Sequence, residues 1–86
     1  MLRLRQHGLE WRQVDDEVVA LDLETARYLA TNRTGALLWD ELAAGATREA
    51  LIDRLMDRWD LDEARAAADV DAFLAMLTDR GLLEST

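Results

Sequence analysis

The spacing of the apolar residues changes once along this chain, and that change most restricts what the chain can fold into. Up to about residue 32, apolar side chains come in short runs rich in β-branched and aromatic residues, separated by polar breaks. From Thr34 onward they recur every three or four residues. The first pattern is typical of short strands and the second of amphipathic helices. We therefore predict an α+β fold in which the strands precede the helices.

The first part of the chain predicts a meander of three antiparallel strands. Leu9 to Val14 alternates between two faces, Glu17 to Leu23 (EVVALDL) is apolar and β-branched, and Arg27 to Thr31 (RYLAT) forms the third run. The polar breaks between these runs are short, as expected for neighbouring antiparallel strands. So small a sheet is stable only if helices pack on one face. The polar residues before Leu9 are predicted to be frayed.

The second part predicts three helices, each with one apolar stripe. The stripes are Leu38, Trp39 and Leu42, then Leu51, Ile52, Leu55, Met56 and Trp59, then Ala66, Val70, Phe73, Leu74 and Leu77. Gly45 and Gly81 are suited to ending helices, and Thr47 to starting one. Both helical tryptophans are expected in the core, and Leu82-Leu83 should fold back onto it. Residues 1–86 thus predict one domain, a winged helix-turn-helix with a three-stranded antiparallel sheet followed by three helices.

Charge and composition argue against several classes of function. The net charge is −8 and the ten basic residues are scattered rather than gathered into a stripe, which disfavours nucleic-acid binding. No run of apolar residues is long enough to span a membrane, and no secretory signal opens the chain. The absence of cysteine excludes disulfides, thiolate nucleophiles and cysteine-based zinc sites. We expect a cytoplasmic protein with no membrane or nucleic-acid partner.

No set of residues predicts catalysis. The single histidine, His7, has no second histidine with which to share a metal, and the four glycines are too dispersed to form a phosphate-binding loop. The acidic pairs Asp15-Asp16 and Asp62-Glu63 fall at a turn and at a helix start, where carboxylates cap the backbone. We therefore expect no enzyme activity, no catalytic residue, no metal and no cofactor.

Two groups of residues, taken in order, resemble one known family. The first group is Asp22, Thr25, Tyr28, Asn32, Thr34-Gly35-Ala36 and Trp39, and the second is Asp69-Val70, Phe73-Leu74, Leu77 and Gly81-Leu82-Leu83. Over residues 9–84 the chain is similar to the PqqD-like proteins, also called RiPP recognition elements. It departs from them at Ala26, where the family often has glycine, and at Thr31, where it often has leucine.

The resemblance implies a peptide-binding module. Members of this family bind the leader segment of a ribosomally made precursor peptide, which lies along the third strand beside the third helix. Among them, the chain looks most like the stand-alone leader-binding protein of lasso-peptide biosynthesis, which works beside a separate leader peptidase and a macrolactam cyclase. A PqqD that presents its precursor to a radical S-adenosylmethionine enzyme is the close alternative. A winged-helix transcription factor and a structural adaptor are the alternatives from other classes.

Carried over to this chain, the resemblance predicts a binding site on two elements. Its residues are Arg27, Tyr28, Leu29, Ala30 and Thr31 of the third strand, and Asp69, Val70, Phe73, Leu74 and Leu77 of the third helix. Val70 and Phe73 are expected to face the cleft, whereas Leu74 and Leu77 fit the cleft and the core equally well. Tyr28 could lie on the rim or pack inward. Asp69 could contact the leader or pair with an arginine of this chain.

Overall fold

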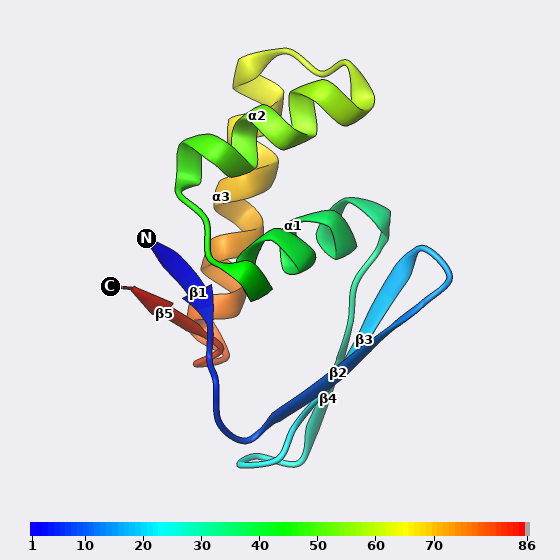
Figure 1. The fold of residues 1–86 in the computed structure, drawn as a ribbon, viewed down its shortest axis with the longest axis vertical. Helices are drawn as coiled ribbons and strands as arrows, with labels where there is room; N and C mark the ends of the chain where they lie inside the picture. Colours follow the sequence, from blue (N-terminus) through cyan, green and yellow to red (C-terminus); the bar gives the residue numbers. More distant parts are fainter. Residues whose placement is uncertain (86) are drawn as a thin grey trace.

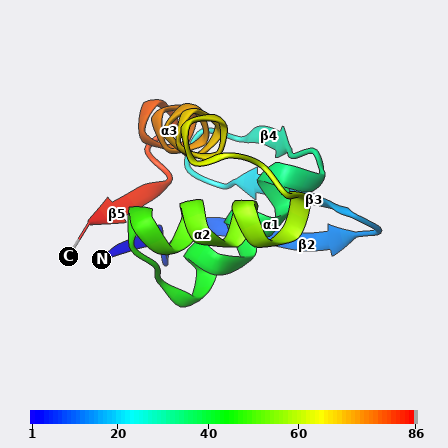
Figure 2. The same cartoon turned by 90° about the horizontal axis from the view of Figure 1, so that it is seen from above.

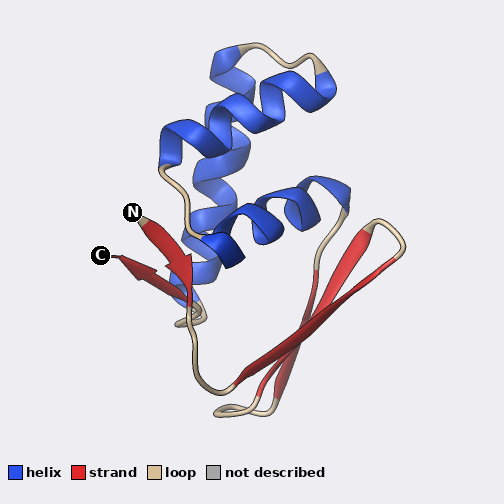
Figure 3. Ribbon diagram, in the orientation of Figure 1, coloured by secondary structure: helices blue, strands red, loops and turns tan. Residues whose placement is uncertain are grey.

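The computed structural model describes residues 1–85 and confirms the predicted three-stranded antiparallel sheet followed by three helices, to which it adds a short strand near each end (Figure 1). Its elements are β1 (Leu2–Leu4), β2 (Leu9–Val14), β3 (Glu17–Asp22), β4 (Arg27–Ala30), α1 (Arg33–Ala44), α2 (Arg48–Trp59), α3 (Glu63–Asp79) and β5 (Leu83–Ser85). Strands β2, β3 and β4 form an antiparallel sheet in that order, with β3 in the centre. The helices lie together on one side of this sheet (Figure 3).

Alternation along β3 decides which face of the sheet meets the helices. Val18, Ala20 and Asp22 are buried, while Val19 is exposed and Leu21 is only half-buried on the opposite face. The register pairs Ala20 with Trp11 on one side and with Leu29 on the other, so these residues share the inner face. Among residues 1–85, no helix covers the outer face, which carries Val19 and Leu21 (Figure 3).

The turn between β3 and β4 contains Ala26, one of the two positions at which the chain departs from the PqqD-like pattern. Ala26 has φ of 58°, a left-handed conformation in which a β-carbon is strained and glycine is not. The glycine that is frequent at this position in the family is therefore what the backbone favours. In this chain alanine adopts that left-handed conformation.

Each helix begins at a side chain that accepts a backbone hydrogen bond. Asn32 caps α1 by accepting from the Gly35 N–H, Thr47 caps α2 through Ala50, and Asp62 caps α3 through Arg65. The prediction that Thr47 starts the second helix is confirmed. Gly45, with φ of 96°, ends α1 as predicted.

The core lies where the three helices meet the inner face of the sheet. Trp39 is fully buried, as predicted, and its ring packs edge-on against Trp11 of β2 with ring centroids 5.9 Å apart. Trp59 is half-buried and packs against the margin of the core. The largest fully buried side chains are Trp39, Leu38, Leu42, Leu51, Leu55, Leu77, Leu82, Val18 and Val70.

The N-terminal segment is ordered, so the prediction that it is frayed was wrong. Leu2–Leu4 pairs antiparallel with Leu83–Ser85, and Leu4 is buried in the core. The two ends of the described chain therefore lie side by side (Figure 1). Leu82 is buried, which confirms that the C-terminal tail folds back, and the pairing of β5 with β1 anchors it.

Candidate peptide-binding groove

Strand β4 is an edge strand with backbone groups that point away from the sheet. The N–H of Thr31 donates to the Val18 carbonyl oxygen at 2.9 Å, so Thr31 and Val18 form a hydrogen-bonded pair. Along an antiparallel pair of strands, hydrogen-bonded residue pairs alternate with pairs that are not hydrogen-bonded. The backbone N–H and C=O groups of Leu29 and Arg27 therefore also point toward β3. The N–H and C=O groups of Tyr28 and Ala30 consequently point outward, where an added strand would pair with them.

A groove of about 530 Å³ lies beside this edge. Three segments form its walls: the end of β4 with the residues after it, the first turns of α1, and one face of α3. The lining residues are Ala30, Thr31, Asn32, Thr34, Gly35, Leu38, Arg65, Asp69, Ala72, Phe73 and Met76. Viewed from above, α3 is seen along its axis and β4 lies on the same side of the molecule (Figure 2).

Phe73 forms part of the apolar wall and depends on a glycine opposite it. A β-carbon at Gly35 would lie 3.0 Å from Cε1 of Phe73 and 3.0 Å from Cβ of Thr31. Both distances are shorter than ordinary carbon–carbon contacts. Gly35 therefore allows the ring to rest close to the backbone of α1.

Comparison with known proteins places the chain in a family. The family model described as "Coenzyme PQQ synthesis protein D (PqqD)" matches residues 17–83, most of the chain. The chain belongs to the PqqD family. Among curated proteins, no sequence match was found. This membership confirms the resemblance drawn from the sequence motifs.

Two solved structures have the PqqD-like fold of this chain over nearly its whole length. "TbiB1 in Complex with the TbiA(beta) Leader Peptide" superposes with a TM-score of 0.88 at 27% identity, covering 98% of this chain and 96% of that one. "Lasso peptide synthetase B1 complexed with the leader peptide" gives 0.84 at 25% identity, covering 98% of both chains. The predicted α+β architecture is thereby confirmed.

The predicted strand residues of this PqqD-family chain fall on three different surfaces. Ala30 and Thr31 line the groove, although the Thr31 side chain is buried and its Oγ1 accepts from the Val18 N–H. Tyr28 is opposite Leu21 on the outer face and is 71% exposed, so it does not pack inward. Arg27 and Leu29 lie on the inner face of the sheet and line a second, smaller pocket.

The predicted helix residues divide between the groove and the core. Asp69 and Phe73 line the groove, as the family resemblance implied. Val70, which we expected to face the cleft, is fully buried in the core, as is Leu77. Leu74 is half-buried against the core and does not line the groove. The reason is geometric: positions 70, 74 and 77 follow the stripe of α3 that meets the other helices, and positions 69 and 73 lie on the stripe beside it.

Sequence reasoning missed several lining residues. On α3 these are Arg65, Ala72 and Met76, which share a face with Asp69 and Phe73 because they are spaced by three or four residues. That spacing was a usable signal, since it extends the predicted wall along the same face. Thr34, Gly35 and Leu38 of α1 were also missed as site residues, although Thr34-Gly35 belongs to the family pattern.

The groove is weakly charged. Its two ionisable residues, Arg65 and Asp69, are one helical turn apart with 3.9 Å between Nε and Oδ2, and both are well exposed. Pairing of Asp69 with an arginine, one of the two alternatives left open by the sequence, is what the structure has. Exposed pairs of this kind contribute little to stability and leave Asp69 accessible to a ligand.

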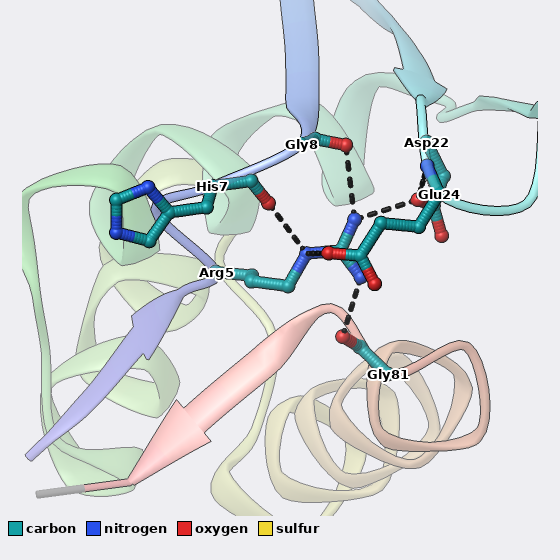
Figure 4. A network of polar contacts seen from close by, with 6 residues as sticks. All are labelled: Arg5, His7, Gly8, Asp22, Glu24 and Gly81. Carbon is teal, nitrogen blue, oxygen red and sulfur yellow. Dashed lines mark hydrogen bonds and ion pairs between the residues drawn. The ribbon is translucent and has the colours of Figure 1, made fainter.

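An arginine from the N-terminal segment fixes the sheet against the helices. Arg5 donates to Asp22 Oδ1 at 2.6 Å and to the carbonyl oxygens of His7, Gly8 and Gly81, so it joins β3 to the end of α3 (Figure 4). The hydrogen bond from Arg5 lowers the pKa of the Asp22 carboxyl below its ordinary value. The same bond raises the pKa of Arg5. This network ties the end of β3 to the end of α3, away from the residues that line the groove.

Within residues 1–85 there is no cluster of histidine, cysteine and acidic side chains that could hold a metal ion. Nor is any helix of this part of the chain long and apolar enough to cross a membrane. The edge of β4 and the groove beside it offer backbone pairing next to an apolar surface.

Proposed function

We propose that this protein binds the leader segment of a ribosomally synthesised precursor peptide by strand addition to β4, and presents it to separate enzymes of lasso-peptide biosynthesis. One observation carries the proposal: the outward N–H and C=O groups of Ala30 border a groove with an apolar wall formed by Phe73 and Met76. An extended peptide that adds to a sheet edge and buries alternate side chains needs these two features together.

The matched structures support this proposal. Both are proteins in complex with a leader peptide, and one of them is a lasso peptide synthetase B1. Since superposition covers nearly the whole of this chain, the β4 edge and α3 have counterparts in both complexes. We extend the proposal to a leader peptidase and a cyclase as the enzymes that receive the bound precursor, because a module of this kind carries no catalytic set of its own.

Energetics indicate which part of the interaction supplies the affinity. Ordering the backbone of one peptide residue costs roughly 1–2 kcal/mol, and a hydrogen bond contributes only about 0.5–1.5 kcal/mol net. The free energy gained from hydrogen bonds with Tyr28 and Ala30 is therefore nearly cancelled by the conformational entropy that the peptide loses. Burying one large apolar side chain contributes about 1.5–3 kcal/mol. We infer that strand pairing sets the register and that contacts with Phe73 and Met76 set the affinity.

The test is a titration with a labelled leader. The probe is the synthetic leader segment of the cognate precursor peptide, with a scrambled peptide of the same composition as control. We expect saturable binding of the leader only, and an unchanged leader mass after incubation with the pure protein. Equal binding of the scrambled peptide, no binding of either, or cleavage of the leader would contradict the proposal.

Presentation to other enzymes requires a second assay. With the leader peptidase added, precursor cleavage should be faster in the presence of this protein than in its absence. A Phe73→Ala variant that is folded but binds poorly should lose most of that acceleration. If cleavage is equally fast without this protein, it does not deliver the precursor to the peptidase.

A further inference from the structure

One of the outward backbone groups on the β4 edge is already occupied by a side chain. Nη1 of Arg80, the residue that follows α3, donates to the carbonyl oxygen of Tyr28 at 3.1 Å. This is the same carbonyl that a peptide strand would use if its pairing extended past Ala30 toward the start of β4. A bound leader must therefore either stop pairing before Tyr28 or take over the position of the Arg80 guanidinium.

The surroundings of Arg80 favour an acidic group at this position. Arg80 and Arg27 line the same pocket of about 130 Å³, between β4 and the end of α3. Within residues 1–85 neither arginine has an ion-pair partner. Two carboxylates also line the pocket, but Asp22 is neutralised by Arg5. Arg27, Arg80 and the remaining Asp79 thus leave one net positive charge in a chain whose overall charge is −8.

Arginine is well suited to reading a carboxylate. Its planar guanidinium carries five N–H donors and matches the two oxygens of a carboxylate in a paired geometry. The bond to the Tyr28 carbonyl uses one Nη1 donor of Arg80. A carboxylate offers a charged acceptor in place of a neutral carbonyl, and charge-assisted bonds are the stronger of the two. An acidic side chain could therefore draw Arg80 away from the edge and release the Tyr28 carbonyl for pairing.

We propose that Arg80, with Arg27 beside it, forms a subsite for a carboxylate side chain of the bound leader, and that this contact fixes the register in which the leader pairs with β4. The inference rests on the proposed function and adds a specificity determinant to it. It assigns the two ends of the edge different roles. The end next to Phe73 takes apolar side chains, and the end next to Arg80 takes an acid.

The experiment is a double-mutant cycle between protein and leader. Each Asp and Glu of the leader probe used in the titration above is replaced in turn by Asn or Gln, and each peptide is titrated against the parent protein, Arg80→Gln and Arg54→Gln. Arg54 is the matched control, because its ion pair with Glu41 joins α2 to α1 and involves no residue of β4. Thermal melts confirm that each variant is folded, and the leader substitutions leave the protein itself unaltered.

We expect one acidic leader position at which neutralisation weakens binding to the parent by about fivefold or more. The same change should have little further effect on binding to Arg80→Gln, and Arg54→Gln should behave as the parent does. Arg80→Glu combined with Lys at that leader position should restore part of the lost affinity. The effect should shrink at high salt.

Two outcomes are separated by this design. If the parent binds the leader tightly but no acidic position is coupled to Arg80, the carboxylate subsite is wrong and the proposed function stands. If the parent does not bind the leader before any substitution is made, the proposed function itself fails, and the subsite fails with it.

Discussion

Val70 and Phe73 lie one turn apart on α3, and one belongs to the core while the other lines the groove. Phe73 is half-buried, lines the groove and rests on Gly35, whereas Val70 is fully buried and has no surface in the groove. Phe73→Ala removes part of the apolar wall against which a leader side chain would be buried. Because full burial of a large apolar side chain contributes about 1.5–3 kcal/mol, we expect a loss of about 1–2 kcal/mol, or roughly five- to thirtyfold in Kd.

Val70→Ala is the matched control for that change. It deletes two buried carbon atoms and leaves a cavity, so it should lower the free energy of unfolding by about 2 kcal/mol. Affinity of the folded protein for the leader should stay within about twofold of the parent value. Urea unfolding gives the stability of each variant, and titration at a temperature where both are folded gives Kd. If Val70→Ala weakens binding as much as Phe73→Ala does while remaining folded, our division of α3 into groove and core stripes is wrong.

Three further predictions follow from backbone geometry and the polar network. Ala26→Gly should raise the free energy of unfolding by about 1 kcal/mol, because glycine removes left-handed strain; an unchanged urea midpoint would show that the strain is negligible. Asp22 has a lowered pKa through Arg5, so its stabilising effect should be complete above its ordinary pKa and vanish as pH falls through the lowered value. The stability difference between parent and Asp22→Asn, measured by urea unfolding, should therefore shrink in acid; a pH-independent difference would disprove the linkage. Gly35→Ala should displace the Phe73 ring and weaken leader binding in the same titration, and unchanged affinity would mean that the leader does not reach this wall.

Local patterns were sufficient to predict the main architecture. Alternation in Leu9–Val14 and the apolar, β-branched run from Glu17 to Leu23 predicted the first two strands of the meander, and the apolar stripes with Thr47 as a cap predicted the helices. What local patterns missed depends on residues far apart in the sequence. The short strand Leu2–Leu4 has no strong propensity of its own and exists because it pairs with Leu83–Ser85.

The limits of sequence reasoning are clearest at the site. The sequence pattern put Val70 and Phe73 on one apolar face, and only the rotation of α3 against its neighbours shows that Val70 is buried in the core while Phe73 lines the groove. The family pattern indicated β4 and α3, which both contribute residues to the groove, but could not show that Thr31 turns inward to Val18. The hydrogen bond from Arg80 to Tyr28 joins residues 52 positions apart, and no local pattern predicts such a contact.

The central claim is that the leader adds as a strand to β4, and amide hydrogen exchange at single-residue resolution tests it most directly. The sheet has a second edge at β2, where the bond from Leu23 N–H to the Gly8 carbonyl sets the alternation so that the amides of Trp11 and Gln13 point outward. With leader bound, we predict slower exchange at Ala30, and at Tyr28 if pairing extends that far, and unchanged exchange at Trp11 and Gln13. Slower exchange at Trp11 and Gln13 with no change at Ala30 would contradict strand addition to β4.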